Sequence, residues 1–484
     1  MKKISVLFTI FLTLYTASNA QVTFRNTYSG VTITSVSQTS DHGYIIAGFS
    51  TTFTLGSKDI VLIKTDSTGA ITWSQTFGNN VNANADDIAA NAVEIPGGAG
   101  NYVAGQFWNQ GNNTYEVYVL KTDTGGNRLW SKTMYNGGYD KGMHVENDGT
   151  GGCYIVGWLG NSSKGYLGRL DAAGNLSWQF SIAYLTGAWI LQSGRRTPDG
   201  GMICGGYDNE LGAYEMFLVK TNSGGAIQWQ AGYSMIGTFN FCYDVCLASD
   251  NGYLVAGGSA GINLVKVDGS GNVQWSNTYG AGPRAYSVRQ CADTGFVVLA
   301  NDISNNQYLM KTDSSGNVLW TTKYTGAYAI NTVEQTSDGG FVLAMGSDVI
   351  KTDANGVTGC GETQVTLAAS NLTLSTRTPA AYTTASFTNN TAADGSTSPV
   401  VPVSYCITTG VEDESGINPD ASGEELRVEN AEVYDVLGQK RLTLNPSPFG
   451  EGLRLDVSSL SAGIYFVRLI SEKKTVTKKI VVVK

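Results

Sequence analysis

The sequence predicts an all-β protein whose main part is a seven-bladed β-propeller, a closed ring of four-stranded sheets. Three observations support this fold class: a ten-residue pattern ending in Trp recurs along the chain, an apolar pattern recurs in step with it, and successive Trp residues lie 45 to 57 positions apart. A repeat of about 40–50 residues is typical of propeller blades, which stack because no single unit buries its own core.

The Trp pattern first appears as KTDSTGAITW at Lys64–Trp73, which reads as a strand, a tight turn with Asp and Gly, and a second strand. Five further copies end in Trp, at Trp130, Trp178, Trp229, Trp275 and Trp320. A seventh copy starts at Lys351 and ends in Cys360 instead. We expect the Trp residues to pack between blades as part of the scaffold, and the repeated Asp residues to cap the turn.

The second pattern gives the number of strands in a unit. It runs from GYIIAG at Gly43 to GFVLAMG at Gly340 and has seven copies. The first unit contains four runs rich in Val, Ile, Thr and Tyr, separated by Gly, Asp and Asn, which indicates strands and no helix. These runs are 32–38, 43–48, 59–66 and 70–77.

The connections between the runs predict two different faces of the ring. The turns that join runs one and two, and runs three and four, are short and nearly constant, whereas the other connections vary. All constant turns then lie on one face and all variable loops on the other, where we expect ligand binding.

The pattern resembles kelch repeats. Residues 21–28 match a fourth strand with Phe24 in place of Trp, so the N-terminal strand should complete the last blade and close the ring.

The rest of the chain divides into three further parts. Residues 1–20 have the basic, apolar and small-residue regions of a secretory signal peptide, with cleavage expected after Ala20. The propeller spans 21–358. Residues 359–423 are rich in Thr, Ser and Ala and form either a partly ordered linker, which we favour, or an extended strand pair tied by a disulfide between Cys360 and Cys406. Residues 424–484 read as a small β-sandwich or sheet with alternating strands.

Three motifs occur in order in this last part and end at the chain terminus: YDVLGQK at Tyr434, LSAGIYFVRL at Leu460 and KKIVVVK at Lys478. They resemble the C-terminal sorting domain of the Por, or type IX, secretion system. The resemblance implies export across the outer membrane through the type IX machinery, and either attachment to the cell surface or release.

Composition excludes several classes of partner. The formal net charge of −9 argues against nucleic acid and anionic membranes. No apolar run after residue 20 is long enough for a transmembrane helix. The seven cysteines lack metal-binding spacing, so we expect no metal, no cofactor, and five buried apolar cysteines on strands.

We find no recognisable catalytic motif, so an enzyme is disfavoured. Only two histidines exist, His42 in a turn and His144 on a first strand that could line the central channel. The arginines are too scattered in the sequence to predict a cluster.

The variable loops supply aromatic residues interleaved with Asn and Gly, which suit a sugar ring or a protein epitope. The candidate ligand-binding residues are Trp108, Tyr115, Trp158, Trp189, Tyr207, Phe239 and Tyr328. The first hypothesis is a secreted or surface-attached adhesion module for glycan or protein ligands. The alternatives are an extracellular polysaccharide-degrading enzyme, a glycoside hydrolase or lyase, and a purely structural surface protein.

Overall fold

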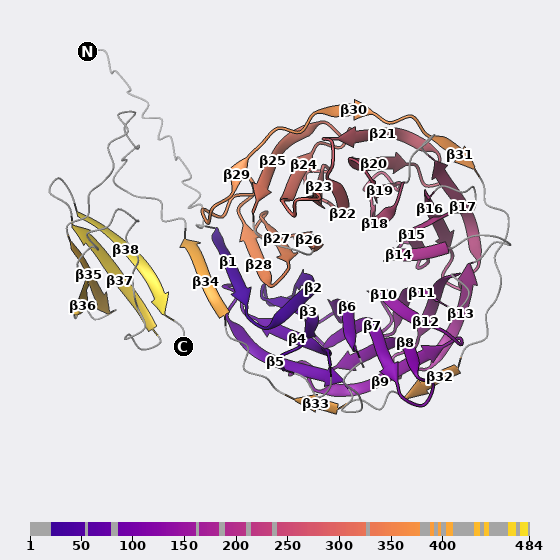
Figure 1. Ribbon diagram of the computed structural model, residues 1–484, viewed down its shortest axis with the longest axis horizontal. Helices are drawn as coiled ribbons and strands as arrows, with labels where there is room; N and C mark the ends of the chain where they lie inside the picture. The colour runs from indigo at the N-terminus through magenta and orange to yellow at the C-terminus, as the bar shows by residue number, and fades with distance from the viewer. Residues whose placement is uncertain are drawn as a thin grey trace, which may run out of the picture. The chain divides into compact units, whose positions relative to one another are not determined.

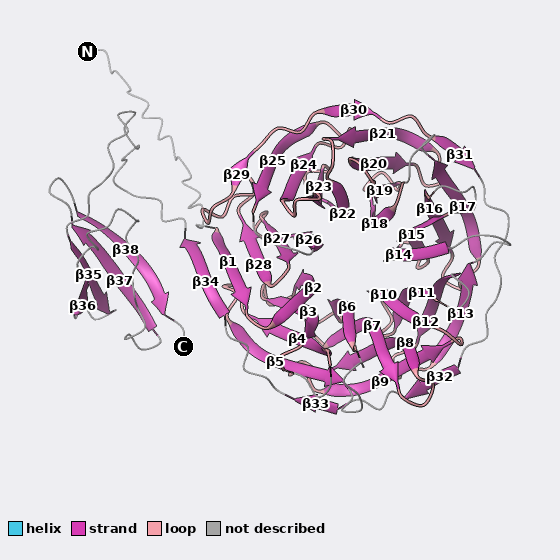
Figure 2. Cartoon of the chain, in the orientation of Figure 1, coloured by secondary structure: helices cyan, strands magenta, loops and turns pink. Residues whose placement is uncertain are grey.

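The computed structural model describes most of the propeller and four strands near the C-terminus. The described residues are 21–53, 57–78, 86–160, 164–182, 189–209, 214–234, 240–325, 330–377, 388–391, 395–397, 403–409, 430–435, 440–444, 463–470 and 475–482. Gln21–Thr408 form one compact unit, and the later strands belong to a second. The described residues form strands and no helices (Figure 2), hence no helix that could cross a membrane. The expected signal peptide lies outside the described residues.

The larger unit is a ring of seven sheets, with the first strand of each sheet beside the central channel (Figure 1). Blade one consists of β2 (Val31–Gln38), β3 (Tyr44–Ser50), β4 (Asp59–Thr65) and β5 (Ile71–Gly78). Blade two consists of β6 (Ile88–Glu94), β7 (Asn101–Asn109), β8 (Thr114–Thr122) and β9 (Arg128–Tyr135). Blade three consists of β10 (Asp140–Asn147), β11 (Cys153–Leu159), β12 (Lys164–Leu170) and β13 (Leu176–Ile182). Blade four consists of β14 (Trp189–Arg196), β15 (Met202–Asp208), β16 (Glu215–Thr221) and β17 (Ile227–Ser234). Blade five consists of β18 (Cys242–Leu247), β19 (Tyr253–Gly257), β20 (Ile262–Val267) and β21 (Val273–Tyr279). Blade six consists of β22 (Arg284–Gln290), β23 (Phe296–Asn301), β24 (Gln307–Thr312) and β25 (Val318–Tyr324). The predicted seven-bladed propeller is confirmed.

The seventh blade closes the ring with the first strand of the chain. It consists of β26 (Ile330–Gln335), β27 (Phe341–Met345), β28 (Asp348–Thr352) and β1 (Val22–Tyr28). β1 pairs antiparallel with β28, and Phe24 lies opposite Lys351. A Cβ built on Gly69 of the next blade would lie 2.9 Å from the Phe24 ring. Phe24 therefore takes the place of a blade Trp, as predicted.

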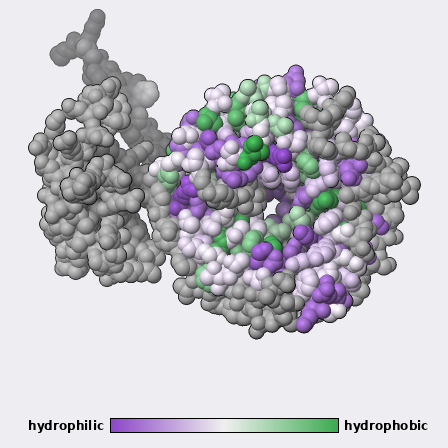
Figure 3. Space-filling model, in the orientation of Figure 1, coloured by the Kyte–Doolittle hydropathy of each residue, from purple (hydrophilic) through white to green (hydrophobic). Residues whose placement is uncertain are grey.

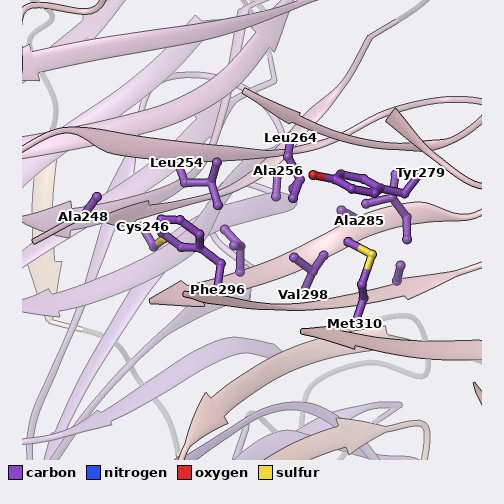
Figure 4. Packing of buried hydrophobic residues seen from close by; sticks show 13 residues of the cluster. Cys246, Ala248, Leu254, Ala256, Leu264, Tyr279, Ala285, Phe296, Val298 and Met310 are labelled. Carbon is purple, nitrogen blue, oxygen red and sulfur yellow. The ribbon is translucent and has the colours of Figure 1, made fainter. Parts of the chain in front are cut away.

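The cores lie between blades, one at each junction. The core between blades five and six combines side chains of β18 to β21 with side chains of β22 to β24, among them Leu254, Tyr279 and Phe296 (Figure 4). Each repeat Trp packs against the core between its own blade and the next, and Trp73 donates its indole N–H to the Thr124 carbonyl at 2.9 Å. The expectation that the Trp residues pack between blades is confirmed.

The glycine of each third-to-fourth turn makes this Trp packing possible. Gly126 has φ +80°, and a Cβ built there would lie 2.6 Å from the Trp73 ring. We expect Gly126→Ala to lower the free energy of unfolding by about 2 kcal/mol, since it combines a left-handed backbone with a steric clash. Gly97→Ala is the matched control, because Gly97 has the same φ and no atom within 4 Å of a built Cβ. Urea denaturation measures both, and equal losses would contradict a packing role.

The turns on one face of the ring, which we call the hairpin face, are held by repeated side-chain contacts. Asp66 Oδ1 accepts hydrogen bonds from the backbone N–H groups of Thr68 and Ala70, at 2.8 and 3.0 Å. In a later copy, the Asn272 side chain and backbone N–H hold the pKa of Asp268 below its usual range. The repeated Asp residues therefore cap turns, as predicted. The opposite face, which carries the connections of variable length, is the loop face.

A segment that follows the seventh blade runs around the outside of the ring (Figure 1). Its strands are β29 (Thr363–Gln364), β30 (Ala369–Asn371), β31 (Ser375–Arg377), β32 (Thr388–Thr391), β33 (Gly395–Thr397) and β34 (Val403–Thr409). They add an outer strand to β25, β21, β17, β9, β5 and β1, in that order. We call these six strands the belt. The sequence favoured a linker here over a strand pair tied by a disulfide. The described residues form strands that extend six blades, and Cys360, just before them, is disulfide-bonded.

The second unit contains one described sheet. Its strands, in spatial order, are β36 (Lys440–Leu444), β35 (Asn430–Asp435), β37 (Gly463–Ile470) and β38 (Thr475–Val482). All three pairings are antiparallel. A second sheet, which the expected sandwich requires, is not among the described residues, and neither is the stretch 410–429 before this sheet.

Candidate ligand-binding site at the central channel

A β-bulge at the same place in each first strand shapes the central channel. The register shifts between Ile33 and Ser35 in β2, and corresponding shifts occur in the other six first strands. The residue at the equivalent position of each first strand is polar: Ser35, Asn91, His144, Ser193, Asp244, Ser287 and Thr332. A cavity of about 390 Å³ lies here, lined by residues of all seven first strands. Figure 3 shows the opening in the middle of the ring.

Most of these polar residues join neighbouring blades. Five of them accept a hydrogen bond from a backbone N–H of a neighbouring blade: Ser35 from Ala92, Asn91 from Val145, Asp244 from Val288, Ser287 from Val333 and Thr332 from Val36. Buried N–H groups need such partners, so this ring of contacts is primarily structural. His144 and Ser193 are the two exceptions, and both lie beside the charged residues Arg195 and Asp244.

Asp244 is the centre of the charged group. Its carboxylate accepts hydrogen bonds from Arg195 at 2.9 Å, Arg289 at 2.6 Å, and the hydroxyls of Ser193 and Ser287. Burial alone would raise its pKa, but the two guanidinium groups outweigh burial and hold the pKa of Asp244 well below its ordinary value. Asp244 is therefore ionised and its lone pairs are occupied. Two of the arginines that are scattered in the sequence, Arg195 and Arg289, are thus brought together at Asp244.

His144 lines the channel, as anticipated for a residue on a first strand. Arg195 Nη1 lies 2.8 Å from His144 Nε2, and Glu146 lies 3.4 Å from the same nitrogen. Arginine only donates, so Nε2 accepts and the proton of the neutral ring is on Nδ1. Burial and the charge of Arg195 lower the pKa of His144. No group of three or more metal-ligating side chains occurs within the described ranges.

A row of aromatic rings leads from this cavity across the loop face. Tyr286 stacks on Tyr243 at 4.6 Å between ring centroids, and Tyr243 lies 5.9 Å from Phe241. Phe241 contacts both Tyr207 and Tyr214, at 4.9 and 4.8 Å. All five rings are partly exposed, and Tyr243 and Tyr286 line the cavity. We call these five residues the aromatic row.

The structure separates the aromatic residues that the sequence pointed to. Tyr207 belongs to the aromatic row. Trp158 lies on β11, where Lys141, a residue that lines the cavity, approaches its ring at 6.0 Å. Trp189 is buried and packs against Phe217 at 4.5 Å, so it belongs to the core between blades three and four and not to a binding surface.

Two other predicted residues form a separate group. Trp108, which is only 8% exposed, contacts Tyr115 at 4.9 Å, and Tyr115 contacts the exposed Tyr139 at 5.2 Å. Phe239 and Tyr328 lie outside the described residues. The predicted residues therefore do not converge on one site, and the aromatic row contains four members that the loop argument did not select.

The cysteines behave largely as expected. Cys153, Cys204, Cys242, Cys246 and Cys291 are buried free thiols on or beside propeller strands. Cys360 is disulfide-bonded. Its predicted partner, Cys406, lies on β34, but the side chain is outside the described residues, so the pairing stays a prediction.

The solved structures that match the chain are distant in sequence. A protein of unknown function from Bacteroides caccae is 12% identical and has a TM-score of 0.38, over 53% of this chain and 90% of that one. The Pan2 WD40 domain of Neurospora crassa is 11% identical with a TM-score of 0.44, over 67% and 89%. Sqt1 of Chaetomium thermophilum is 9% identical with a TM-score of 0.42, over 69% and 99%. Similarity of this degree says nothing about ligands, and the kelch-like character of the repeat stays a prediction.

The family comparison concerns the C-terminal unit. No curated protein matches the chain. Residues 414–483 match the family described as the secretion system C-terminal sorting domain, which confirms the resemblance seen in the motifs at Tyr434, Leu460 and Lys478. Such a domain implies an interaction with the type IX secretion machinery, and secretion with attachment to the cell surface. The chain is therefore a seven-bladed β-propeller that carries a member of the secretion system C-terminal sorting domain family at its C-terminal end.

Proposed function

We propose that this exported propeller is an adhesion or recognition module that binds a glycan on its loop face, at the mouth of the central channel. The observation that carries the proposal is the aromatic row, five partly exposed rings in continuous contact that end on the cavity. Aromatic faces combine a large apolar surface with a polar edge, which suits the apolar face and hydroxyl rim of a sugar ring.

Polar side chains around the row support a sugar ligand. Tyr243 and Tyr286 share the cavity with three amide side chains: Gln192, from the blade next to that of Tyr243, and Asn91 and Gln106, from blade two. A few polar groups among aromatic walls are typical of small-ligand pockets, and the volume of about 390 Å³ lies in their usual range. The site therefore combines stacking surfaces with hydrogen-bond donors and acceptors.

We further propose that the site binds without catalysing a reaction. Polysaccharide hydrolysis commonly needs one carboxylate as a base or nucleophile and one carboxylic acid as a proton donor. Burial raises the pKa of Glu334 above its usual range, which would suit an acid. However, the Asp244 carboxylate accepts hydrogen bonds from two arginines, two serines and two backbone N–H groups, so it has no lone pair for a substrate or a water. Glu334 does not line the cavity, and its carboxylate accepts a hydrogen bond from the Gln38 backbone N–H at 3.0 Å, so we assign both carboxylates a structural role.

Substitution of the aromatic row tests the proposal. We expect Tyr243→Ala and Tyr286→Ala each to lower glycan binding about tenfold, because loss of one stacking platform removes on the order of 1–2 kcal/mol. Glycan arrays followed by calorimetric titration measure the effect. Tyr139→Ala is the control, since Tyr139 is 55% exposed and lies in the separate group with Tyr115.

Two results would contradict the proposal. If Tyr243→Ala and Tyr286→Ala bind glycan like the wild type and Tyr139→Ala does not, the binding site is instead the group that contains Trp108 and Tyr115. Release of reducing sugars from a polysaccharide by the wild-type protein, abolished by Glu334→Gln, would instead establish the enzyme.

A further inference from the structure

Two adjoining grooves lie on the hairpin face, away from the aromatic row. One is at the junction of blades four and five and has a volume of about 690 Å³; the other is at the junction of blades five and six and has a volume of about 420 Å³. Ala248, Ser249 and Gln290 line both grooves, so the two form one continuous surface. Their volumes lie in the usual range for ligand sites.

The first groove contains a compact polar network beside a Trp. Lys220 Nζ donates to Asp199 at 2.8 Å, to the Gln228 side-chain oxygen at 2.9 Å and to the Thr221 carbonyl at 2.7 Å. Trp229 is partly exposed in the same groove and donates its indole N–H to the Gly269 carbonyl at 3.0 Å. The ring is therefore fixed in orientation.

The second groove repeats this network at the equivalent positions. Lys266 Nζ donates to Asp250 at 2.7 Å, to the Gln274 side-chain oxygen at 2.7 Å and to the Val267 carbonyl at 3.1 Å. Trp275 lines the groove and is partly exposed. Two neighbouring sites thus present the same chemistry in the same order.

The networks leave the grooves electrically neutral but rich in hydrogen-bonding groups. Each lysine is almost buried, and its three donors are taken by a carboxylate, an amide oxygen and a backbone carbonyl. Because the amide oxygens of Gln228 and Gln274 accept from lysine, their amide N–H groups are left to donate outward. Asp199 and Asp250 are 46% and 49% exposed and can accept further hydrogen bonds.

The complete set is specific to these two neighbours. The exposed position before the repeat Trp is Gln228 and Gln274 here, whereas the other copies of the pattern have Thr72, Leu129, Ser177 and Leu319. The fold alone therefore does not require glutamine at this position, since the ion pair of lysine with the turn Asp also forms beside Leu319, between Lys311 and Asp293.

We propose that the two grooves together bind one extended, neutral polysaccharide chain, with a sugar ring on Trp229 and another on Trp275. Gln228 and Gln274 donate to sugar hydroxyls, and Asp199 and Asp250 accept from them. The absence of net charge in each network selects against an acidic chain, and the repeated spacing suits a polymer of repeated units. This site is independent of the aromatic row and of the function proposed for it.

Titration of the purified full chain with oligosaccharides tests the proposal. The probes are hexasaccharides of β-1,4-glucose, β-1,4-xylose, β-1,4-N-acetylglucosamine and α-1,4-glucose, with oligogalacturonate as the acidic comparison. We expect saturable binding of at least one neutral hexasaccharide, and affinity lowered about fivefold in Gln228→Ala and in Gln274→Ala, the effect of one lost hydrogen bond. The double variant should lose about 25-fold. Leu129→Ala, at the matching position of blade two, should bind like the wild type.

The outcomes separate this site from the channel. Binding that survives Tyr243→Ala but weakens in the double glutamine variant supports the proposal. Loss of binding in Tyr243→Ala with full affinity in the double variant overturns it, as does stronger binding of oligogalacturonate. Absence of saturable binding for every neutral hexasaccharide also overturns it.

Discussion

A chain that stops after Glu362 is expected to unfold about 10 °C below one that stops after Thr409, because the first lacks the belt. The belt strands form backbone pairs with β25, β21, β17, β9 and β5, and β34 lies beside β1. Leu372 is buried against the core between blades four and five. Loss of these contacts removes on the order of 5 kcal/mol.

Both truncated chains lack the sorting domain, so their comparison measures the belt together with the predicted Cys360–Cys406 disulfide, and Cys406→Ala in the longer chain measures the disulfide alone. Differential scanning calorimetry gives the melting temperatures, and light scattering should show that the shorter chain associates, because its outer strands carry unpaired N–H and C=O groups. Equal melting temperatures would mean that the contacts of the belt do not stabilise the propeller.

Asp244→Ala is expected to lower the free energy of unfolding by about 3–5 kcal/mol, because it leaves Arg195 and Arg289 without their shared partner in the channel. The matched control is Asp86→Ala, which breaks an ion pair with Lys58 in which both side chains are partly exposed, 25% for Asp86 and 32% for Lys58. Such a surface pair contributes less than about 1 kcal/mol. Urea denaturation at pH 7 measures both, and similar losses would contradict a special role for Asp244.

The same carboxylate predicts a pH dependence. The pKa of Asp244 is lower in the folded protein than in the unfolded chain, so its stabilising contribution is present above the unfolded value of about 4 and is lost as the pH falls below it. The difference in unfolding free energy between the wild type and Asp244→Asn should therefore shrink below about pH 4.

Much of the propeller was predictable because its signals are local. The Asp and Gly turns, the repeat Trp and the match of Phe24 to a fourth strand each depend on a few neighbouring residues, and together they gave the number of blades and the closure. The belt was not predictable in this way. Its strands are as short as two residues and pair through backbone groups. The position of each strand therefore depends more on the blade edge with which it pairs than on its own side chains.

The candidate site was only partly predictable for a similar reason. Selecting residues by their position in variable loops found Tyr207 but not Tyr243 and Tyr286, which lie on first strands. The β-bulges next to these tyrosines place them at the cavity, and a bulge has no clear mark in a single sequence. Likewise Arg195 and Arg289 are far apart in the chain, and only the closed ring brings both to Asp244.

The belt also sets an order for the assembly of the molecule. Each belt strand needs the outer edge of a blade that has already formed, and the last strand, β34, lies beside β1, the first strand of the chain. The belt can therefore dock completely only after all seven blades have closed into a ring. We therefore expect its docking to follow closure of the propeller and to depend on the outer edges of six blades.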